Sequence, residues 1–423
     1  MEILVLFGSL VLLLALSIPI GISLGLATVI ALIYTGTIPL IMVAQNAFAA
    51  LDSFPLLAIP FFMLAGALMG YGGISKRLVN LADAMVGAVL GGLAMVTVMA
   101  CMFFAAISGS GPATVSAIGS FMIPSMKEKH YDSDFAAALT ATAGSIGVII
   151  PPSIPFVIYG VVSGVSVGEM FISGIIPGII IGLSLMAVSY RTARKKGYPR
   201  TSNPPQIWPT LKEAFWALLV PIIILGGIYG GIFTPTEAAV VASVYALLIG
   251  KFIYKELDFK TIYAAFKDAA LVNGATTFMV GLSMSFAAFL AMEQIPIKIC
   301  TWMLSISSSQ ITIFLIVNLL LLIVGCFVDN ISSMIILTPI LLPIMLKLGV
   351  DPVHFGLVMT VALATGFVTP PYGANLFVAS AVSGVSMLKI SRAVVPFILA
   401  MLFCLLLFTY IPALSMGLVW LLR

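Results

Sequence analysis

Long apolar runs recur along the whole chain and are separated by short polar segments. Runs of about 17 residues or more can cross roughly 30 Å of hydrocarbon as helix, and these runs do not alternate as the strands of a membrane β-barrel do. The pattern predicts an all-α polytopic membrane protein with about ten transmembrane helices. The expected spans are 3–20, 22–36, 57–74, 134–162, 170–190, 213–231, 236–252, 271–292, 355–385 and 393–413.

Two proline pairs interrupt this pattern at corresponding positions. The first break is Gly147-Val-Ile-Ile-Pro-Pro-Ser-Ile-Pro155 and the second is Gly366-Phe-Val-Thr-Pro-Pro-Tyr-Gly373. Their Gly, Pro and Pro residues are each separated by 219 residues, and so are Pro124 from Pro343 and Pro177 from Pro396. A shared offset at five anchors indicates two copies of one unit. The expected division is a first repeat at 1–190, a basic linker at 191–212 and a second repeat at 213–423.

Each predicted repeat also contains a candidate re-entrant hairpin. In the first, 88–124, the tip is Ser108-Gly-Ser-Gly-Pro112; in the second, 310–346, the tip is Asp329-Asn330. The broken helices are expected at 134–162 and 355–385, and two amphipathic segments at Gln45 to Phe54 and Glu256 to Asp268. With these spans, every Lys and Arg except Lys298, Lys347 and Arg423 lies on the cytoplasmic side. The positive-inside rule therefore predicts a periplasmic N-terminus and two repeats of inverted orientation.

Composition excludes several classes of protein. Hydrophobic residues make up 61% of the chain and charged residues 8%, against about 25% charged in soluble domains. The net charge of +4 comes from short loops between spans, so no nucleic-acid partner is expected. The four cysteines are isolated in apolar segments and only two histidines exist, which predicts buried thiols and no multi-histidine metal centre. The expected environment is the lipid bilayer.

The breaks and hairpin tips carry the candidate chemistry. A Pro-Pro pair leaves several backbone carbonyls without helical partners, and in hydrocarbon these need another partner, which a cation can be. The first tip adds hydroxyls and a helix N-terminus that can face an anion. Interrupted helices at matching positions of inverted halves are typical of the binding sites of secondary transporters.

The chain resembles the large membrane subunit (DctM type) of tripartite ATP-independent periplasmic (TRAP) transporters, within the ion-transporter superfamily. The residues that carry this resemblance span 108 to 373 in family order. They are Ser108-Gly-Ser-Gly-Pro-Ala-Thr-Val115, Ile150-Pro-Pro-Ser-Ile-Pro155, Phe233-Thr-Pro-Thr-Glu-Ala238, Ile336-Leu-Thr-Pro-Ile-Leu341 and Thr369-Pro-Pro-Tyr-Gly373.

This resemblance implies a Na⁺-coupled symporter of an organic acid in a bacterial inner membrane. It implies elevator-type movement, in which the hairpins and broken helices carry substrate against a scaffold of outer helices. It also implies two protein partners: a small four-helix membrane subunit (DctQ type) and a periplasmic substrate-binding protein (DctP type). The substrate could be a C4-dicarboxylate, sialic acid or another sugar acid. No organic cofactor is expected, and Na⁺ is the only expected metal.

Two Na⁺ sites and a substrate site are assigned on these segments. Asp329 is the one acid within a predicted hairpin, and an acid in the membrane is costly unless it has a role; the alternative is a helix-capping Asp. The first Na⁺ site would use Ser108, Ser110, Ser145, Gly147 and Ile150. The second would use Asp329, Asn330, Ser332, Gly366, Thr369 and Pro370, and the substrate ligands would be Thr114, Ser153, Ser333, Tyr372 and Asn375.

Other functions fit the sequence less well. An intramembrane enzyme would need juxtaposed catalytic groups, and the chain has no H-E-x-x-H, paired membrane aspartates or G-x-S-x-G. A passive channel or a stand-alone Na⁺- or H⁺-coupled carrier could also use broken helices. Proton coupling usually relies on chains of acids or histidines in the membrane, and only Asp329 qualifies. Glu237, in Thr234-Pro-Thr-Glu, is predicted to cap a helix.

Overall fold

A computed structural model describes residues 1–36, 38–201, 204–307 and 309–422; the predicted external Arg423 lies outside these ranges. All regular secondary structure in the described residues is helical, which confirms the predicted class. By length and composition, seven of the described helices could cross a membrane singly, or nine if two bent pairs each count as one span. The remaining apolar helices, such as α2 (Ile20–Thr35) and α17 (Pro352–Gly366), are shorter than 18 residues.

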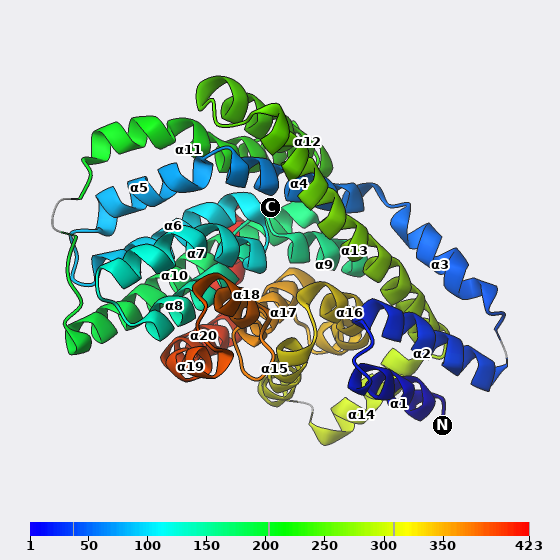
Figure 1. Ribbon diagram of the computed structural model, residues 1–423. Helices are drawn as coiled ribbons and strands as arrows, with labels where there is room; N and C mark the ends of the chain where they lie inside the picture. Colours follow the sequence, from blue (N-terminus) through cyan, green and yellow to red (C-terminus); the bar gives the residue numbers. More distant parts are fainter. Residues whose placement is uncertain (37, 202–203, 308, 423) are drawn as a thin grey trace.

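The helices form two groups (Figure 1). The outer group consists of α1 (Glu2–Ala15), α2 (Ile20–Thr35), α3 (Ile41–Leu51), α4 (Ala58–Tyr71), α5 (Ile74–Val86), α11 (Ile207–Tyr229), α12 (Pro235–Leu248), α13 (Phe259–Met292) and α14 (Ile295–Ile306). The inner group consists of α6 (Gly92–Ser108), α7 (Gly111–Glu128), α8 (Ser133–Gly144), α9 (Ile154–Ser163), α10 (Val167–Lys196), α15 (Gln310–Phe327), α16 (Asn330–Lys347), α17 (Pro352–Gly366), α18 (Ala374–Ser383), α19 (Met387–Ala393), α20 (Val395–Tyr410) and α21 (Ala413–Leu422).

The helix boundaries reproduce the offset of the sequence anchors. The first hairpin, α6–α7, turns between Ser108 and Gly111, and the second, α15–α16, turns between Phe327 and Asn330, 219 residues later in each case. The X-Pro bonds Pro151-Pro152 and Pro370-Pro371 are both cis. The two copies exchange a helix, because α9 packs on α16 and α17 whereas α18 packs on α7 and α8. Each hairpin is thus covered by the helix that follows the break in the other copy, α18 on the first hairpin and α9 on the second.

Several elements differ from the predicted ones. The second amphipathic segment and the span 271–292 are one helix, α13, which begins at a capping box formed by Asp258 and Thr261. The first copy is divided at this place by Pro55, in a 3₁₀ turn (Phe54–Leu57), whereas Gly274 occupies the matching position in α13. Helix α10 continues through the basic residues to Lys196 and α11 begins at Ile207, so both ends of the predicted linker 191–212 are helical. Helices α5 and α14 were not predicted.

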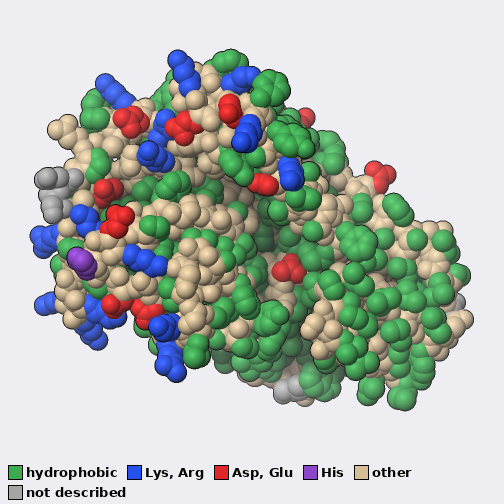
Figure 2. Space-filling model, viewed as in Figure 1, with side chains coloured by type: hydrophobic (Ala, Val, Ile, Leu, Met, Phe, Trp, Pro, Cys, Tyr) green, Lys and Arg blue, Asp and Glu red, His purple; other side chains and the backbone are tan. Residues whose placement is uncertain are grey.

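Other predictions are confirmed. Glu237 and Thr234 form a capping box at the start of α12, and all four cysteines are buried and unpaired. In the view of Figure 2, the Lys and Arg side chains gather on the upper and left part of the molecule, and the right part is largely hydrophobic. This segregation is what short basic loops on one side of a membrane produce.

Hydroxyl groups tie the outer helices together. Ser243 of α12 donates to the carbonyl of Phe61 in α4 at 2.7 Å, and Ser285 of α13 donates to the carbonyl of Val43 in α3 at 2.7 Å. Arg77 of α5 forms an ion pair with Glu256 at 2.7 Å. Interhelical hydrogen bonds of this kind stabilise packing where lipid provides no hydrophobic drive. The outer group is therefore a connected frame.

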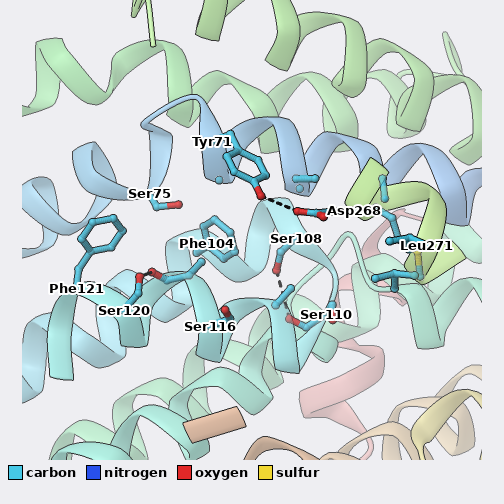
Figure 3. A pocket seen from close by; sticks show the side chains of 18 residues that line it. Tyr71, Ser75, Phe104, Ser108, Ser110, Ser116, Ser120, Phe121, Asp268 and Leu271 are labelled. Carbon is cyan, nitrogen blue, oxygen red and sulfur yellow. Dashed lines mark hydrogen bonds between the residues drawn. The ribbon is translucent and has the colours of Figure 1, made fainter. Parts of the chain in front are cut away.

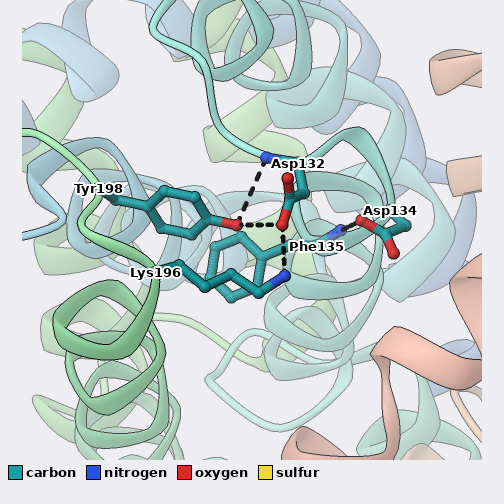
Figure 4. Close-up of polar contacts among 5 residues, drawn as sticks. All are labelled: Asp132, Asp134, Phe135, Lys196 and Tyr198. Carbon is teal, nitrogen blue, oxygen red and sulfur yellow. Dashed lines mark hydrogen bonds and ion pairs between the residues drawn. The ribbon is translucent and has the colours of Figure 1, made fainter.

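The linker after α10 is anchored on the start of α8 (Figure 4). Tyr198 donates to the Oδ2 atom of Asp132 at 2.8 Å, and Lys196 forms an ion pair with the same oxygen. These contacts lower the pKa of Asp132, the Lys196 hydrogen bond having the larger effect. Tyr198 also stacks on Tyr131, with ring centroids 4.3 Å apart. These contacts hold the segment after α10 against the start of α8.

Candidate functional site: two hairpin tips and a central cavity

The first hairpin tip is closed by hydroxyl groups. Helix α6 ends at Ser108, the next residue, Gly109, has φ of 64°, and α7 has Pro112 in its first turn. The Ser108 and Thr114 hydroxyls lie 2.9 Å apart and share a hydrogen bond, and Thr114 donates to the carbonyl of Ser110 at 2.8 Å. The structure thus brings together three residues that sequence reasoning assigned to an ion site or a substrate site.

The first break lies directly against this tip. The amide of Ile154 donates to the carbonyl of Gly109 at 3.2 Å. A Cβ atom on Gly147 would lie 2.5 Å from the Thr114 hydroxyl and 2.6 Å from the Ser110 carbonyl, so only glycine fits. Ser145 is fully buried beside it, and Ile150 is half-buried. These residues could supply backbone and hydroxyl oxygens to one ion.

Ser153 serves the first break itself. Its hydroxyl donates to the carbonyl of Val148 at 2.7 Å and accepts from the amide of Phe156 at 3.3 Å, which makes it the N-cap of α9. One otherwise free carbonyl of the break is thereby satisfied within the chain. The Ser153 hydroxyl thus both donates and accepts a hydrogen bond within the chain.

The second hairpin tip is polar and largely unpaired. Asp329 caps α16 through Oδ2, which accepts from the amides of Ile331 at 3.0 Å and Ser332 at 3.1 Å. Its other oxygen, both amide atoms of Asn330 and the hydroxyl of Ser333 are buried and have no hydrogen-bond partner among the described residues. Each such group costs about 1–3 kcal/mol. Their clustering at one tip is what a bound ion or other polar ligand would explain.

The second break packs closely on this hairpin. A Cβ atom on Gly366 would lie 2.4 Å from the backbone carbon of Gly325 in α15. Ser332 of the tip contacts the sulfur of Met279 in α13 at 2.9 Å. The hydroxyl of Thr369 donates to the Thr365 carbonyl at 2.8 Å, and Pro370 follows. The predicted members of the second site therefore lie on two segments in direct contact.

Two predicted substrate residues lie elsewhere. Tyr372 is 61% exposed and contacts Phe377 edge-on, with ring centroids 5.2 Å apart. Asn375 is fully buried and reaches the first break rather than the second, where its Nδ2 atom donates to the Ser145 hydroxyl at 3.2 Å. The structure thus groups Asn375 with residues of the other copy.

A cavity of about 660 Å³ lies between the first hairpin and helices α4 and α13 (Figure 3). Its size suits a small organic ligand. Its polar lining comprises Tyr71, Ser75, Ser108, Ser110, Ser116, Ser120 and Asp268. Tyr71 donates to Asp268 at 2.6 Å, and Asp268 is the only charged residue in the described lining.

Sequence reasoning missed most of this cavity. From the N-cap of α7 onward, the small residues on one face of the helix line the cavity: Ser110, Ala113, Ser116, Ala117 and Ser120. This spacing of small residues along one helical face was a usable signal. Tyr71 and Asp268 could not be found in this way, because only packing brings α4 and α13 together.

Comparison with known proteins agrees with the fold. The model of the family "Tripartite ATP-independent periplasmic transporter, DctM component" matches residues 7–414. An isethionate TRAP transporter permease protein DctMQ of Oleidesulfovibrio alaskensis is 50% identical over 97% of this chain, which spans 65% of that longer protein. The C4-dicarboxylate TRAP transporter large permease DctM of Rhodobacter capsulatus is 40% identical, with 99% of each chain covered.

A sialic acid TRAP transporter large permease SiaM of Vibrio cholerae is 39% identical over 96% of this chain and 95% of its own length. The YdaH transporter of Alcanivorax borkumensis has a similar fold, with a TM-score of 0.64 at 15% identity over 93% of this chain and 90% of its own. The DctM family model and the permease relatives cover nearly the whole chain, so the chain is a multi-pass bacterial transport protein and not an enzyme. The chain belongs to the DctM family, the large permease components of the tripartite ATP-independent periplasmic transporters.

Proposed function

We propose that the chain is the large subunit of a Na⁺-coupled importer of a small organic acid in a bacterial inner membrane, with its N-terminus in the periplasm. The observation that carries the ion coupling is the group of buried, unpartnered polar atoms at the Asp329-Asn330 tip. Hard cations prefer oxygen ligands, and a carboxylate, an amide oxygen and the carbonyls of the break can supply them. Two matching tips and breaks support two ions.

The first ion would be held by Ser108, Ser110, Ser145, Gly147 and Ile150, and the second by Asp329, Asn330, Ser332, Gly366, Thr369 and Pro370. Thr114, Ser153 and Ser333 remain candidate substrate ligands at the tips and breaks. Tyr372 remains a candidate at the exposed surface of the second break, and Asn375 holds the first break in place instead. The one charged side chain in the described cavity lining is an acid, Asp268, and no Lys or Arg lines it. The bound Na⁺ ions would therefore neutralise the charge of an anionic substrate. The N-terminus of α7, with Ser110 at its start, would stabilise the acid group further.

The substrate is proposed to be a small hydroxylated or dicarboxylic acid. The relatives are named for isethionate, C4-dicarboxylates and sialic acid, and the highest identity of these three, 50%, is to the isethionate protein. The hydroxyl-rich lining of the cavity suits an acid that carries further polar groups.

Elevator movement is supported by where the cavity lies. One wall belongs to the hairpin α6–α7 and the other to the frame helices α4 and α13. A substrate held between the two groups would cross the membrane if the inner group moved against the frame.

Two partners are proposed. The name DctMQ and the greater length of the isethionate relative support a small membrane subunit as one of them. The family description supports a periplasmic binding protein that delivers the substrate.

The test is uptake into proteoliposomes that contain this chain and its small subunit. Labelled isethionate, succinate and sialic acid are supplied with and without an inward Na⁺ gradient and the binding protein. Accumulation that requires both supports the proposal and names the substrate. Accumulation with Na⁺ alone would make the chain a stand-alone carrier. Accumulation driven by a proton gradient, or mere equilibration, would overturn Na⁺ coupling.

Filling the cavity should block uptake without disturbing the ion sites. Ser116→Phe places a ring where Ser116 projects into the cavity (Figure 3), so uptake should fall at least about tenfold, which corresponds to about 1.4 kcal/mol. Stabilisation by Na⁺ in a thermal melt should persist. The matched variant Ser116→Ala keeps the space open and should retain most uptake. Equal uptake by Ser116→Phe and wild type would mean that substrate does not use this cavity.

A further inference from the structure

Asn375 connects the two breaks. It lies in the first turn of α18, directly after the second break, and its side chain is fully buried. Its backbone amide donates to the carbonyl of Phe367, within the second break, at 3.1 Å. Its side chain points into the other copy, where Nδ2 donates to the carbonyl of Ala141 at 3.1 Å and to the hydroxyl of Ser145 at 3.2 Å. One residue thus bonds to both broken helices.

The Ala141 carbonyl depends on this contact. At the end of α8 the chain tightens into a 3₁₀ turn (Ser145–Val148). The amide of Ser145, which would bond to Ala141 in a continuing α-helix, turns to the carbonyls of Thr142 and Ala143 instead. A carbonyl released inside the membrane needs another donor, and Asn375 supplies it. The amide therefore stabilises the geometry of the first break.

The Asn375 side chain is also wedged against the first hairpin. A Cβ atom on Gly111, the first residue of α7, would lie 3.2 Å from Oδ1 and 3.3 Å from Nδ2 of Asn375. The Oδ1 atom is buried and has no partner among the described residues. The amide thus contacts both the start of the hairpin leg and Ser145, a proposed ion ligand.

The described part of the first copy has no residue that matches the contact of Asn375 with the other break. The position that matches Asn375 in the first copy, 219 residues earlier, is Phe156 in α9. Phe156 is fully buried, and its ring packs where a Cβ atom on Gly174 would lie 2.6 Å away. An aromatic ring offers no comparable amide to the second break. The pseudo-symmetry of the two copies is therefore broken at this contact.

We propose that Asn375 is a positioning residue that couples the two cation sites. A cation at the second break orders its carbonyls, and the hydrogen bond that the Asn375 backbone amide donates to the Phe367 carbonyl transmits that order to α18. The Asn375 amide then holds Ser145 and the end of α8 in the geometry that the first cation needs. By linkage, the first cation strengthens binding of the second by the same factor. This inference rests on the proposed Na⁺ coupling.

The test is a Na⁺ titration of the purified chain followed by thermal stabilisation, with K⁺ keeping ionic strength constant. Initial uptake rates in proteoliposomes give a second titration. Wild type should show a Hill coefficient approaching about 2, the number of coupled sites. In Asn375→Leu, which keeps the volume but removes the amide, the coefficient should fall to about 1 and half-saturating Na⁺ should rise severalfold. Asn375→Ala should show the same lower Hill coefficient and higher half-saturating Na⁺. It replaces the leucine variant in the test if that variant does not fold.

Phe156→Leu is the matched control at the pseudo-equivalent position. It should lower the melting temperature but leave the Hill coefficient as in wild type, which separates coupling from loss of packing. A Hill coefficient unchanged in either folded Asn375 variant would overturn the coupling role and leave Na⁺-driven transport intact. A wild-type protein that responds equally to Na⁺ and K⁺ would overturn the proposed function and this inference together.

Discussion

Replacing Asp329 by asparagine is expected to reduce Na⁺-driven uptake by at least about 100-fold while the protein still inserts in the membrane. Asparagine caps helices as well as aspartate does, so the contacts of Asp329 with Ile331 and Ser332 can persist. The substitution removes the charge and one of the two oxygens that a bound cation could face. Loss of one partner of a buried charge pair costs about 3–5 kcal/mol, which is the source of this expectation. Uptake is measured in proteoliposomes, and insertion by the amount of folded protein purified.

Asp258→Asn is the matched control. Asp258 also caps a helix, accepting from the Thr261 amide at 2.7 Å, but it lies at the exposed start of α13. Its replacement should leave uptake within about twofold of wild type, since Asn and Asp are equivalent caps. Asp329→Ala, which loses charge and cap together, should be inactive and also less stable. Near-normal uptake by Asp329→Asn would reduce Asp329 to a cap and remove the second ion site as assigned.

Gly366→Ala is expected to abolish uptake and to lower stability by about 1–3 kcal/mol, the usual cost of overpacking. The added methyl would lie 2.4–2.6 Å from the backbone of Gly325. Backbone atoms cannot rotate away as a side chain can, so α15 must separate from the second break. That movement would pull the Asp329-Asn330 tip away from the break carbonyls with which it is proposed to share an ion. Uptake and the thermal midpoint are the two measurements.

Gly274→Ala provides the comparison. Gly274 lies within α13, with nothing within 4 Å of the position of an added Cβ. Alanine favours helix over glycine by up to about 1 kcal/mol, so this variant should be as active as wild type and no less stable. If Gly366→Ala transported normally, the hairpin and break would have to tolerate separation, and a shared second ion site would not stand.

The predicted hairpins and breaks depended on strong local signals. Each proline pair removes backbone donors wherever it falls in a helix, and Ser-Gly-Ser-Gly-Pro or Asp-Asn between apolar runs ends one helix and starts the next. The continuity of α13 was not predicted, because an amphipathic segment followed by an apolar one gives the same pattern whether or not the helix bends between them. In the first copy Pro55 enforces a turn, whereas Gly274 in the second is tolerated within a helix.

Sequence alone determined the membrane-helical class, the repeat at an offset of 219, and the positions of the two hairpin tips and the two breaks. These follow from hydrophobicity, from backbone chemistry and from internal comparison of the chain with itself. Tertiary structure alone decided that α18 crosses to the first hairpin and places Asn375 beside Ser145, and that Asp268 faces the serines of α7 across a cavity. Such contacts join residues more than 100 positions apart, and no local preference of the chain specifies them, because they arise only when whole helices pack.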